Sequence, residues 1–571
     1  MKYSELVEIY EALSQTTKKL EKVDILARFL PKLKGDEEKV YLLRGRVFPD
    51  YDEREFGLSG QLSIKVISKS TGVNVEKVVS RFRKLGDLGD VAAELIDKKR
   101  QSTLFSKNLS VDKVFGNLRK LVEIEGKGSV DKKLNLVLEL LTSASGREGR
   151  YIIRTILNDL RVGVADALLR DSIAKAFFEG DKDMNEKVEE AYDKLNDFAL
   201  ILEIARKGKK AFDKVEVVPG RPIKVMLPVK VTELSEAFRI CGRPLAVEHK
   251  YDGFRVLINK DEEGKISLFT RRLDNVTKQF PDVVEIVKKC VKAKSFVLDS
   301  EIVGYDPKKQ RYKPFEAISQ RIRRKHDIES MVKKLPVGIN IFDIIYLNGK
   351  STINFPFEKR RKALEKIVKP EKWKIRLSKQ FISDDEKAIN KFYKDALKVG
   401  EEGIMLKKLD APYRPGRRVG YMVKMKPEAA DLDLVIVGAE YGKGKRSGGL
   451  TSYVLACRSN DGKKFFEVGK ASSGLKEKET EEGTSYAEMD KLLQPLIKSE
   501  KGNVVSVRPK VVVSVTYQNV QPSPRYDSGY ALRFPRITHY RPERGTHDIA
   551  TVKDIKKEFQ RMQKMRKSGL G

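Results

Sequence analysis

The eight residues from Glu248 to Arg255, EHKYDGFR, decide the fold of the central part of this chain. Alternate residues of a strand face the same side, so Glu248 and Lys250 are expected to point into one pocket. The pair Asp252-Gly253 is a turn signal that leads into a second strand, FRVLI. A lysine at such a strand end can be desolvated and surrounded by cations, which lowers its pKa and makes the amine a nucleophile. When this short motif is taken alone, an ordinary surface hairpin explains it equally well.

A series of chemically useful side chains follows this hairpin along the chain. The series consists of Arg271 in LFTRRLDN, Glu301 in FVLDSEIVGYD, Phe342 in INIFDIIYLNG, Glu402 in GEEGIMLK, and Lys424 and Lys426 in YMVKMK. Each residue has a simpler explanation, because acids and lysines on strands usually face water and a phenylalanine between isoleucines usually belongs to the core. Together they supply acids for a divalent metal, an aromatic ring for a base and cations for phosphates. The series therefore predicts a nucleotide-transfer pocket.

The chain before this region is expected to form an all-helical domain over residues 1–215. Leu6, Ile9, Tyr10 and Leu13 recur at i, i+3, i+4 and i+7, which is the spacing of one helix face. Few strand signals occur in this part of the chain. We therefore predict an all-α domain with basic outer faces.

Two changes of composition divide the rest of the chain. A stretch rich in Pro and Gly, residues 219–228, marks the first boundary. Residues 216–427 then combine short strands with helices, which indicates an α+β domain built around antiparallel sheets. A second break at KPEAADLD, residues 426–433, precedes short strands that suit a small β-barrel over residues 428–571, ending in a basic helix.

The chain is strongly basic. Its 571 residues include 115 Lys and Arg against 82 Asp and Glu, a formal net charge of +33. This excess favours a polyanionic partner, most often nucleic acid, although a generally basic surface would give the same total. No apolar run is long enough to span a bilayer, and the N-terminus is amphipathic and acidic, unlike a signal peptide. We expect no membrane partner and a soluble intracellular protein, cytoplasmic in a prokaryote or nuclear in a eukaryote.

The cysteines and histidines are poorly placed for a structural metal site. Cys241, Cys290 and Cys457 lie far apart and form no CxxC motif. That spacing excludes a disulfide scaffold and a four-cysteine zinc site. The four histidines are scattered as well, so a histidine-based metal site is not expected.

The combination of motifs resembles the covalent nucleotidyltransferases, and most closely the ATP-dependent DNA ligases of the archaeal and eukaryotic replicative type. The resemblance covers nearly the whole chain. Residues 523–544, SPRYDSGYALRFPRITHYRPER, are similar to the family's last motif block, and residues 146–164, GREGRYIIRTILNDLRVGV, are similar to its N-terminal DNA-binding domain. The resemblance implies a helical DNA-binding domain, an adenylation domain and a C-terminal OB-fold barrel.

The resemblance also implies roles around the nucleotide. Lys250 forms a phosphoramidate with AMP, Glu248 reads the adenine edge and Phe342 stacks on the base. Glu301 and Glu402 serve the ribose and the metal. The implied cofactors are ATP and Mg²⁺, with Mn²⁺ as an alternative metal.

Five basic residues have implied roles at the phosphates. Arg255 and Arg271 hold the ribose and phosphate, or later the 5′-phosphate of a nick. Arg418 and Lys424 contact phosphates, and Lys426 assists them. The AMP passes from Lys250 to that 5′-phosphate, and the 3′-hydroxyl finally expels it. Catalysis of this kind depends mostly on positioning and charge stabilisation.

The implied partner is nicked duplex DNA, bound by a monomer. A nick has no sequence to read, so contacts are expected mainly to phosphates. The expected DNA-binding residues are Arg533 and Arg536 and a basic loop with Lys443, Lys445 and Arg446. A solubilising turn is the alternative explanation of that loop.

A short motif that begins at residue 101 resembles a partner-binding peptide. Gln101, Leu104 and Phe105 resemble the short peptide by which replication enzymes dock on a sliding clamp, with an apolar anchor in a pocket. The alternative is an ordinary inter-helix loop with one buried phenylalanine.

The chain departs from the family pattern in places. Residues 541–544 read RPER where the family usually has Arg-x-Asp-Lys, the motif to which the resemblance assigns the orientation of pyrophosphate. Ser514, Gln518 and Asn519 stand where relatives often have acids. These changes leave the residues around Lys250 intact.

Other activities share parts of this pattern. An RNA ligase or an mRNA-capping guanylyltransferase shares the lysine chemistry, but the large helical region favours duplex DNA. The basic charge alone would allow a catalytically inactive DNA-binding scaffold, although the set Lys250, Glu301, Glu402 and Lys424 argues against it. An NAD⁺-dependent ligase is disfavoured because its zinc cysteines are missing.

Overall fold

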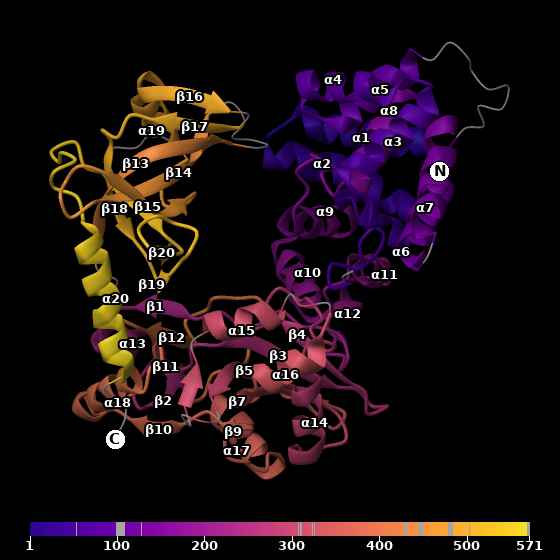
Figure 1. Cartoon of the computed structure of the whole chain (residues 1–571). Coiled ribbons are helices and arrows are strands. Elements are labelled where there is room, and N and C mark those ends of the chain that lie inside the picture. The colour runs from indigo at the N-terminus through magenta and orange to yellow at the C-terminus, as the bar shows by residue number, and fades with distance from the viewer. Residues whose placement is uncertain are drawn as a thin grey trace. The chain divides into compact units, whose positions relative to one another are not determined.

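The computed structural model describes residues 1–52, 54–98, 109–126, 128–306, 308, 311–313, 315–322, 324, 326–427, 431–442, 449–477, 484–501 and 503–567. The chain forms two compact units, drawn in Figure 1. The first unit comprises Met1–Leu227, Gly253–Ser378 and Leu409–Val419, and the second comprises Pro228–Asp252, Lys379–Lys408 and Gly420–Gly571. The chain passes from the second unit to the first within the Asp252-Gly253 turn, so Lys250 and Arg255 belong to different units.

The first part of the first unit is helical and is coloured indigo to purple in Figure 1. Its helices are α1 (Tyr3–Gln15), α2 (Lys19–Phe29), α3 (Gly60–Thr71), α4 (Val75–Leu85), α5 (Leu88–Asp97), α6 (Val111–Glu123), α7 (Ser129–Ser143), α8 (Gly146–Ile156), α9 (Asp166–Phe178), α10 (Lys182–Leu195), α11 (Phe198–Arg206) and α12 (Lys209–Phe212), with short 3-10 helices η1 (Leu30–Leu33) and η2 (Glu37–Arg44). Leu6, Tyr10 and Leu13 of α1 are buried, as their helical spacing predicted. The Ser145 hydroxyl caps α8 and Glu148 completes a capping box, which determines where that helix begins. The prediction of a helical N-terminal region is confirmed.

The rest of the first unit is a mostly antiparallel sheet with flanking helices. Its elements are β3 (Phe254–Lys260), β4 (Ile266–Thr270), α14 (Pro281–Cys290), β5 (Phe296–Asp306), β6 (Arg311–Lys313), α15 (Phe315–Ile322), α16 (Ile328–Lys334), β7 (Val337–Leu347), β8 (Lys350–Ser351), α17 (Phe357–Ile367) and β9 (Ile375–Leu377). The strand order is β4-β3-β5-β7-β8, with β6 beside β5 and β9 parallel to β7. Val287 of α14 and Leu364 of α17 pack in one apolar core with Leu298 and Ile341 of the sheet.

A β-bulge on β7 surrounds one of the predicted site residues. Asp299 pairs with Asp343 and Ser300 pairs with Ile341, so Phe342 is the additional residue between the two pairs. Ile341 and Asp343 are buried, whereas Phe342 is half-buried. A bulge redirects a side chain relative to the regular pleat. Phe342 is therefore partly exposed in a strand whose pattern is otherwise that of a core strand.

The second unit begins with another sheet, of order β1-β12-β11-β2-β10. Its elements are β1 (Val229–Val231), α13 (Leu234–Cys241), β2 (Leu245–Lys250), β10 (Gln380–Ser383), α18 (Glu386–Lys398), β11 (Gly403–Lys408) and β12 (Met422–Met425). Gly403 has φ +149°, and a Cβ there would lie 2.2 Å from the Met425 carbonyl oxygen. The glycine of GEEGIMLK is needed because only a residue without a side chain permits this approach.

The C-terminal part of the second unit is rich in strands, orange to yellow in Figure 1. Its elements are β13 (Leu432–Tyr441), β14 (Leu450–Arg458), β15 (Phe465–Ala471), α19 (Tyr486–Leu493), η4 (Gln494–Leu496), β16 (Ile497–Lys501), β17 (Val504–Val507), β18 (Val512–Thr516), β19 (Asn519–Pro522), β20 (Tyr530–Arg533), β21 (Arg536–Tyr540) and α20 (Val552–Lys567). Strands β15-β14-β13-β17-β16 form a sheet in which β18 pairs with β13 and β21. Strands β19 and β20 form a separate two-stranded sheet. The predicted β-rich C-terminal region with a terminal helix is confirmed. Within the described ranges, every helix is too short or too polar to cross a membrane.

Candidate active site

Lys250 is the last residue of β2 and forms an ion pair with Glu402. The two side chains approach to 2.5 Å between Lys250 Nζ and Glu402 Oε2, with 22% and 20% of their surfaces exposed. The backbone reinforces the pair, because the Glu402 amide donates a 2.9 Å hydrogen bond to the Lys250 carbonyl. The amine is thus held by a strand end on one side and by the residue before β11 on the other.

The carboxyl of Glu402 stays ionised in this setting. Burial by itself would raise its pKa, but the positive charge of Lys250, a hydrogen bond from Lys250 and the charge of Lys426 bring the pKa below its ordinary value. Gln518 also donates a 3.3 Å hydrogen bond to Glu402 Oε1. An ionised, anchored carboxylate beside the amine can orient Nζ toward an electrophile.

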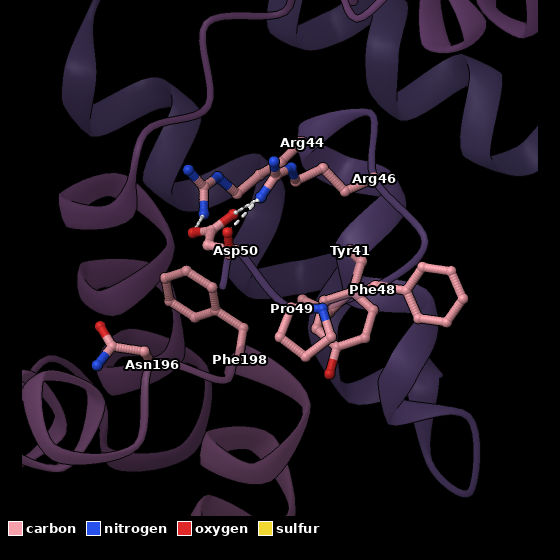
Figure 2. Close-up of a pocket in the computed structure, with 9 residues that line it drawn as sticks. Tyr41, Arg44, Arg46, Phe48, Pro49, Asp50, Asn196 and Phe198 are labelled. Atoms are coloured by element: carbon pink, nitrogen blue, oxygen red, sulfur yellow. Dashed lines mark hydrogen bonds and ion pairs between the residues drawn. The ribbon is translucent and has the colours of Figure 1, made fainter. Parts of the chain in front are cut away.

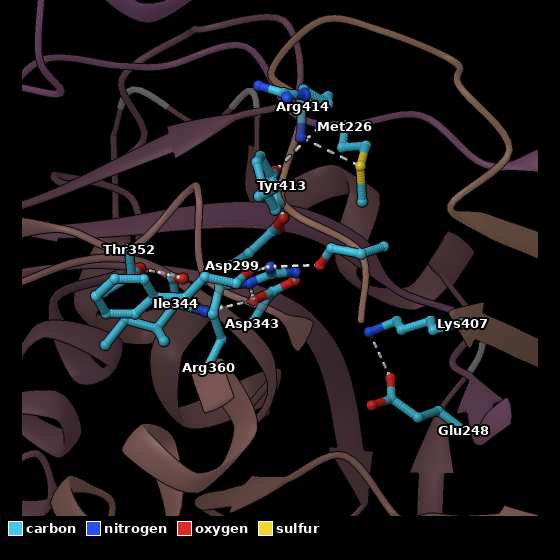
Figure 3. Close-up of polar contacts among 12 residues, drawn as sticks. Met226, Glu248, Asp299, Asp343, Ile344, Thr352, Arg360, Lys407, Tyr413 and Arg414 are labelled. Atoms are coloured by element: carbon cyan, nitrogen blue, oxygen red, sulfur yellow. Dashed lines mark hydrogen bonds and ion pairs between the residues drawn. The ribbon is translucent and has the colours of Figure 1, made fainter. Parts of the chain in front are cut away.

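Glu248 is almost fully buried in the same sheet and has two side-chain donors. Lys407 Nζ lies 2.8 Å from Glu248 Oε2, as Figure 3 shows. Gln380 Nε2 donates a 2.6 Å hydrogen bond to Glu248 Oε1. These partners lie on the two strands that flank β2, so the carboxylate is held from both sides.

Lys424 lies in the same row across the sheet as Glu248. Glu248 pairs with Met405, and Met405 pairs with Lys424. Residues paired across neighbouring strands point to the same face, and Lys250, two residues from Glu248, shares that face. One face of this sheet therefore carries the amine, an acid and a second lysine. Alternation predicted the shared face of Glu248 and Lys250, and the register adds Lys424 to it.

In the first unit, Arg255 is bound to a buried aspartate that the sequence did not reveal as its partner. Arg255 Nε lies 2.8 Å from Asp299 Oδ1, and Nη2 lies 2.5 Å from Oδ2. Arg255 Nη1 donates to the Met226 carbonyl at 2.8 Å. The Tyr413 hydroxyl donates to Asp299 Oδ2 at 2.8 Å (Figure 3). The guanidinium of Arg255 is fixed by these contacts, and its contact with a nucleotide stays a prediction.

Arg271 and Arg418 are exposed and belong to the same unit as Arg255. Burial lowers the pKa of Arg271, and the positive charges of Arg255 and Arg418 lower it further. Cations that repel one another in this way favour the binding of an anion. Arg255 Cζ also lies 5.4 Å from the centre of the Phe342 ring, so the predicted aromatic ring adjoins this basic group.

The predicted metal-binding acids belong to different units. Glu301 pairs with Arg255 in the register of β3 and β5, whereas Glu402 precedes β11. In the part of the chain that the structure describes, no group of three or more His, Cys, Asp and Glu side chains is placed to hold a metal ion. Their role at a metal stays a prediction.

The predicted binding surfaces are only partly described. Arg533 ends β20 and Arg536 begins β21, on either side of the exposed Phe534. The remaining predicted contact residues, Lys443, Lys445, Arg446, Gln101, Leu104 and Phe105, lie outside the described residues.

A separate small pocket in the helical region has its cationic groups already paired. It is lined by Arg44, Arg46 and Asp50, among others, as Figure 2 shows. Arg44 pairs with Asp50 and, at 2.9 Å, with Asp166, while Arg46 lies 3.0 Å from Asp50. Because these charges neutralise one another, the cluster is better suited to holding the fold together than to binding an anion.

Three family models together match most of the chain. Residues 2–174 match the DNA ligase N terminus, residues 225–426 match the ATP dependent DNA ligase domain, and residues 446–544 match the ATP dependent DNA ligase C terminal region. The chain is 44% identical over 563 residues to the DNA ligase of Nanoarchaeum equitans, covering 98% of each chain. The chain belongs to the ATP-dependent DNA ligases. The resemblance found in the motifs is thereby confirmed.

A further relative and a solved structure are also similar to this ligase. The DNA ligase of Thermococcus onnurineus is 39% identical over 572 residues, covering 99% of this chain and 100% of the relative. A solved structure named Pmar-Lig_Pre. has a TM-score of 0.55 at 17% identity, covering 94% of this chain and 99% of the other, which shows a shared fold.

Several residues that hold the ligase site had no signal in its motifs. Gln380 and Tyr413 have ordinary sequence surroundings, and Lys407 ends the quoted GEEGIMLK without being singled out; their roles come from strand pairing and long-range packing. Asp299 had a weak signal, since it shares a strand face with Glu301. Its pairing with Arg255 arises because β3 and β5 are neighbouring strands, which the sequence alone does not indicate.

Proposed function

We propose that this ligase joins the 3′-hydroxyl and the 5′-phosphate at a nick in duplex DNA, using AMP carried on Lys250. The main support is the ion pair of Lys250 and Glu402. The amine ends a strand, lies 2.5 Å from an ionised carboxylate and keeps part of its surface exposed. Glu248 and Lys424 on the same sheet face supply an acid for the base and a cation for phosphate.

The reaction consists of three phosphoryl-type transfers. Lys250 Nζ loses its ammonium proton to solvent and attacks the α-phosphorus of ATP. A P–N bond forms, the P–O bond to pyrophosphate breaks, and the nitrogen releases a further proton. An oxygen of the 5′-phosphate at the nick then attacks the same phosphorus, and the P–N bond breaks as AMP moves to DNA. Finally the 3′-oxygen attacks the 5′-phosphate, loses its proton and expels AMP. Positioning and charge neutralisation are the main contributions of the protein.

Mg²⁺ is the proposed metal, with Mn²⁺ as an alternative. Glu402 suits it, because an ionised carboxylate is a hard oxygen ligand, and one or two carboxylates with substrate phosphates are its usual ligands. Glu301 is the second residue that would hold it. When bound, the metal neutralises phosphate charge and activates the phosphorus.

The proposed DNA contacts are mainly to phosphates, through the helical region and through Arg533 and Arg536. The net charge of +33 supports this mode of binding. We also propose that the ligase acts as a monomer, in the cytoplasm of a prokaryote or the nucleus of a eukaryote, and docks on a sliding clamp through Gln101–Phe105.

Labelling with ATP that carries ³²P at the α-phosphate tests the lysine directly. The unaltered protein is expected to become labelled in the absence of DNA, and Lys250→Ala is expected to abolish the label. Lys408→Ala, on β11, is a control for loss of a lysine from the same sheet. Undiminished labelling of Lys250→Ala would remove the basis of the proposal.

Sealing assays separate the ligase from its rivals. Nicked DNA is expected to be sealed with ATP, whereas an RNA ligase would join RNA and a capping enzyme would become labelled by GTP. A DNA-binding scaffold would bind the nick without taking up label.

A further inference from the structure

The segment Leu409–Val419, which carries Arg418, is attached to the helical region at the residues just before Arg418. Arg417 Nη2 lies 3.1 Å from Glu189 Oε2 on α10. Gly416 has φ +71°, and a Cβ there would lie 2.3 Å from Asp193 Oδ2, so its backbone lies directly against a second carboxylate of α10. Both attachments fall within the first unit.

A second segment, residues 224–227, lies beside the first and connects α10 to Arg255. The Lys224 amide donates to the Asp193 carbonyl at 3.0 Å, and the Leu227 amide donates to the Arg417 carbonyl at 2.9 Å. Between these residues, the Met226 carbonyl accepts from Arg255 Nη1 at 2.8 Å. The segment therefore links α10 to the arginine of the KYDGFR motif.

Tyr413 joins residues 224–227 to the segment Leu409–Val419 next to Arg255. Its hydroxyl accepts a 3.0 Å hydrogen bond from the Met226 amide and donates to Asp299, the partner of Arg255. The Arg414 amide lies 3.4 Å from the Met226 sulfur, and Figure 3 shows these residues together. The segment before Arg418 is thus fixed at Tyr413 and again at Arg417.

The carboxylates on α10 form a charge network with several cations. Arg170 Nη1 lies 2.5 Å from Glu189 Oε1, so Glu189 holds Arg170 and Arg417 with separate oxygens. Lys224 Nζ lies 3.2 Å from Asp193 and 3.2 Å from Asp166. Glu189 is partly exposed whereas Asp193 is buried, so Glu189 is the member that can be altered with least disturbance.

We propose that Glu189 of the helical region is a positioning residue for the adenylation step, acting through Arg417 to hold Arg418 where it contacts nucleotide phosphate. The inference rests on the proposed function. Glu189 acts before DNA is present, although it lies on α10 of the helical region. Arg418 is exposed, and holding the neighbouring residue limits the positions that its long side chain must search on binding.

The test measures the rate of ³²P labelling by ATP in the absence of DNA as the ATP concentration is varied. Glu189→Gln keeps the size of the side chain and is expected to raise the KM for ATP about five- to tenfold, the effect of uncoupling one member of a contact network. The rate at saturating ATP should stay within about twofold, because the lost contact affects binding more than chemistry. Glu186→Gln, at an exposed position one turn earlier on α10, is the matched control and should leave KM unchanged.

Three further variants test whether Glu189 acts through the segment that carries Arg418. Arg417→Gln should raise KM to a similar degree, and the double variant Glu189→Gln/Arg417→Gln should be no worse than either single change. Gly416→Ala, which would place a methyl group against Asp193, should raise KM without altering either charge. Thermal melting verifies that each variant is folded.

The labelling experiments can fail in two ways, which distinguish this inference from the proposed function. An unchanged KM in folded Glu189→Gln, or additive effects in the double variant, overturns the positioning role while leaving Lys250 labelling intact. Failure of the unaltered protein to become labelled would instead overturn the proposed function.

Discussion

Lys407 Nζ lies 2.8 Å from Glu248 Oε2, and the two side chains are only 5% and 2% exposed. Glu248 is also bonded to Gln380, so both of its carboxylate oxygens have protein partners. Removing one partner of a buried pair leaves an uncompensated charge, which costs more than the pair contributes when intact. This relationship makes Lys407 a residue whose loss affects both stability and the placement of Glu248.

Lys407→Met is expected to destabilise the second unit by about 3 kcal/mol, because Glu248 would remain buried without its cation. The change is measured as a shift of the urea midpoint. The double variant Glu248→Gln/Lys407→Met should lose less stability than Lys407→Met alone, since no unpaired charge remains. Equal stability of Lys407→Met and the unaltered protein would contradict this account of the pair.

The pair of Lys250 and Glu402 predicts a dependence of stability on acid. The pKa of Glu402 lies below its ordinary value of 4.5 in the folded protein. A carboxyl with a lowered pKa contributes stability that is fully present above the unfolded pKa and is lost as pH falls through the folded pKa. The contribution of Glu402 should therefore be intact at neutral pH and disappear below 4.5.

Glu402→Gln should weaken this dependence on acid. Melting temperatures measured from about pH 7 to about pH 3 should fall less steeply below 4.5 in the variant than in the unaltered protein. Glu358→Gln, at an exposed acid on α17, is the control and should leave the curve unchanged. Identical curves for Glu402→Gln and the unaltered protein would show that the ion pair does not hold Glu402 ionised.

Binding to nicked DNA is expected to weaken steeply with salt, because the proposed contacts are to phosphates. Arg536 is exposed at the start of β21. Arg536→Gln should lower the slope of log affinity against log salt by about 0.9, the value for one phosphate contact. Lys372→Gln, at an exposed lysine of the first unit, is the matched control and should leave the slope unchanged. A full slope in Arg536→Gln would exclude that arginine from the phosphate contacts.

Local patterns were sufficient to predict much of this protein. The i, i+3, i+4, i+7 spacing of α1 predicted a helix whose Leu6, Tyr10 and Leu13 are buried. Alternation in β2 placed Glu248 and Lys250 on one face, and the turn residues after Lys250 predicted a second strand, β3. The expected hairpin was wrong, because β2 and β3 belong to different sheets and do not pair with each other. Phe342 was selected as a stacking ring, but the bulge that partly exposes it depends on the register of β5 and β7.

The sequence by itself determined the helices, the strand faces and the order of the chemistry-bearing motifs, because these depend on neighbours a few residues apart. Only the tertiary structure decided which residues hold those motifs in place. Tyr413 reaches Asp299 across 114 residues, and Arg417 reaches Glu189 across 228. Such pairs carry no local spacing signal, because they form only when sheet order and helix packing bring distant segments within hydrogen-bond distance.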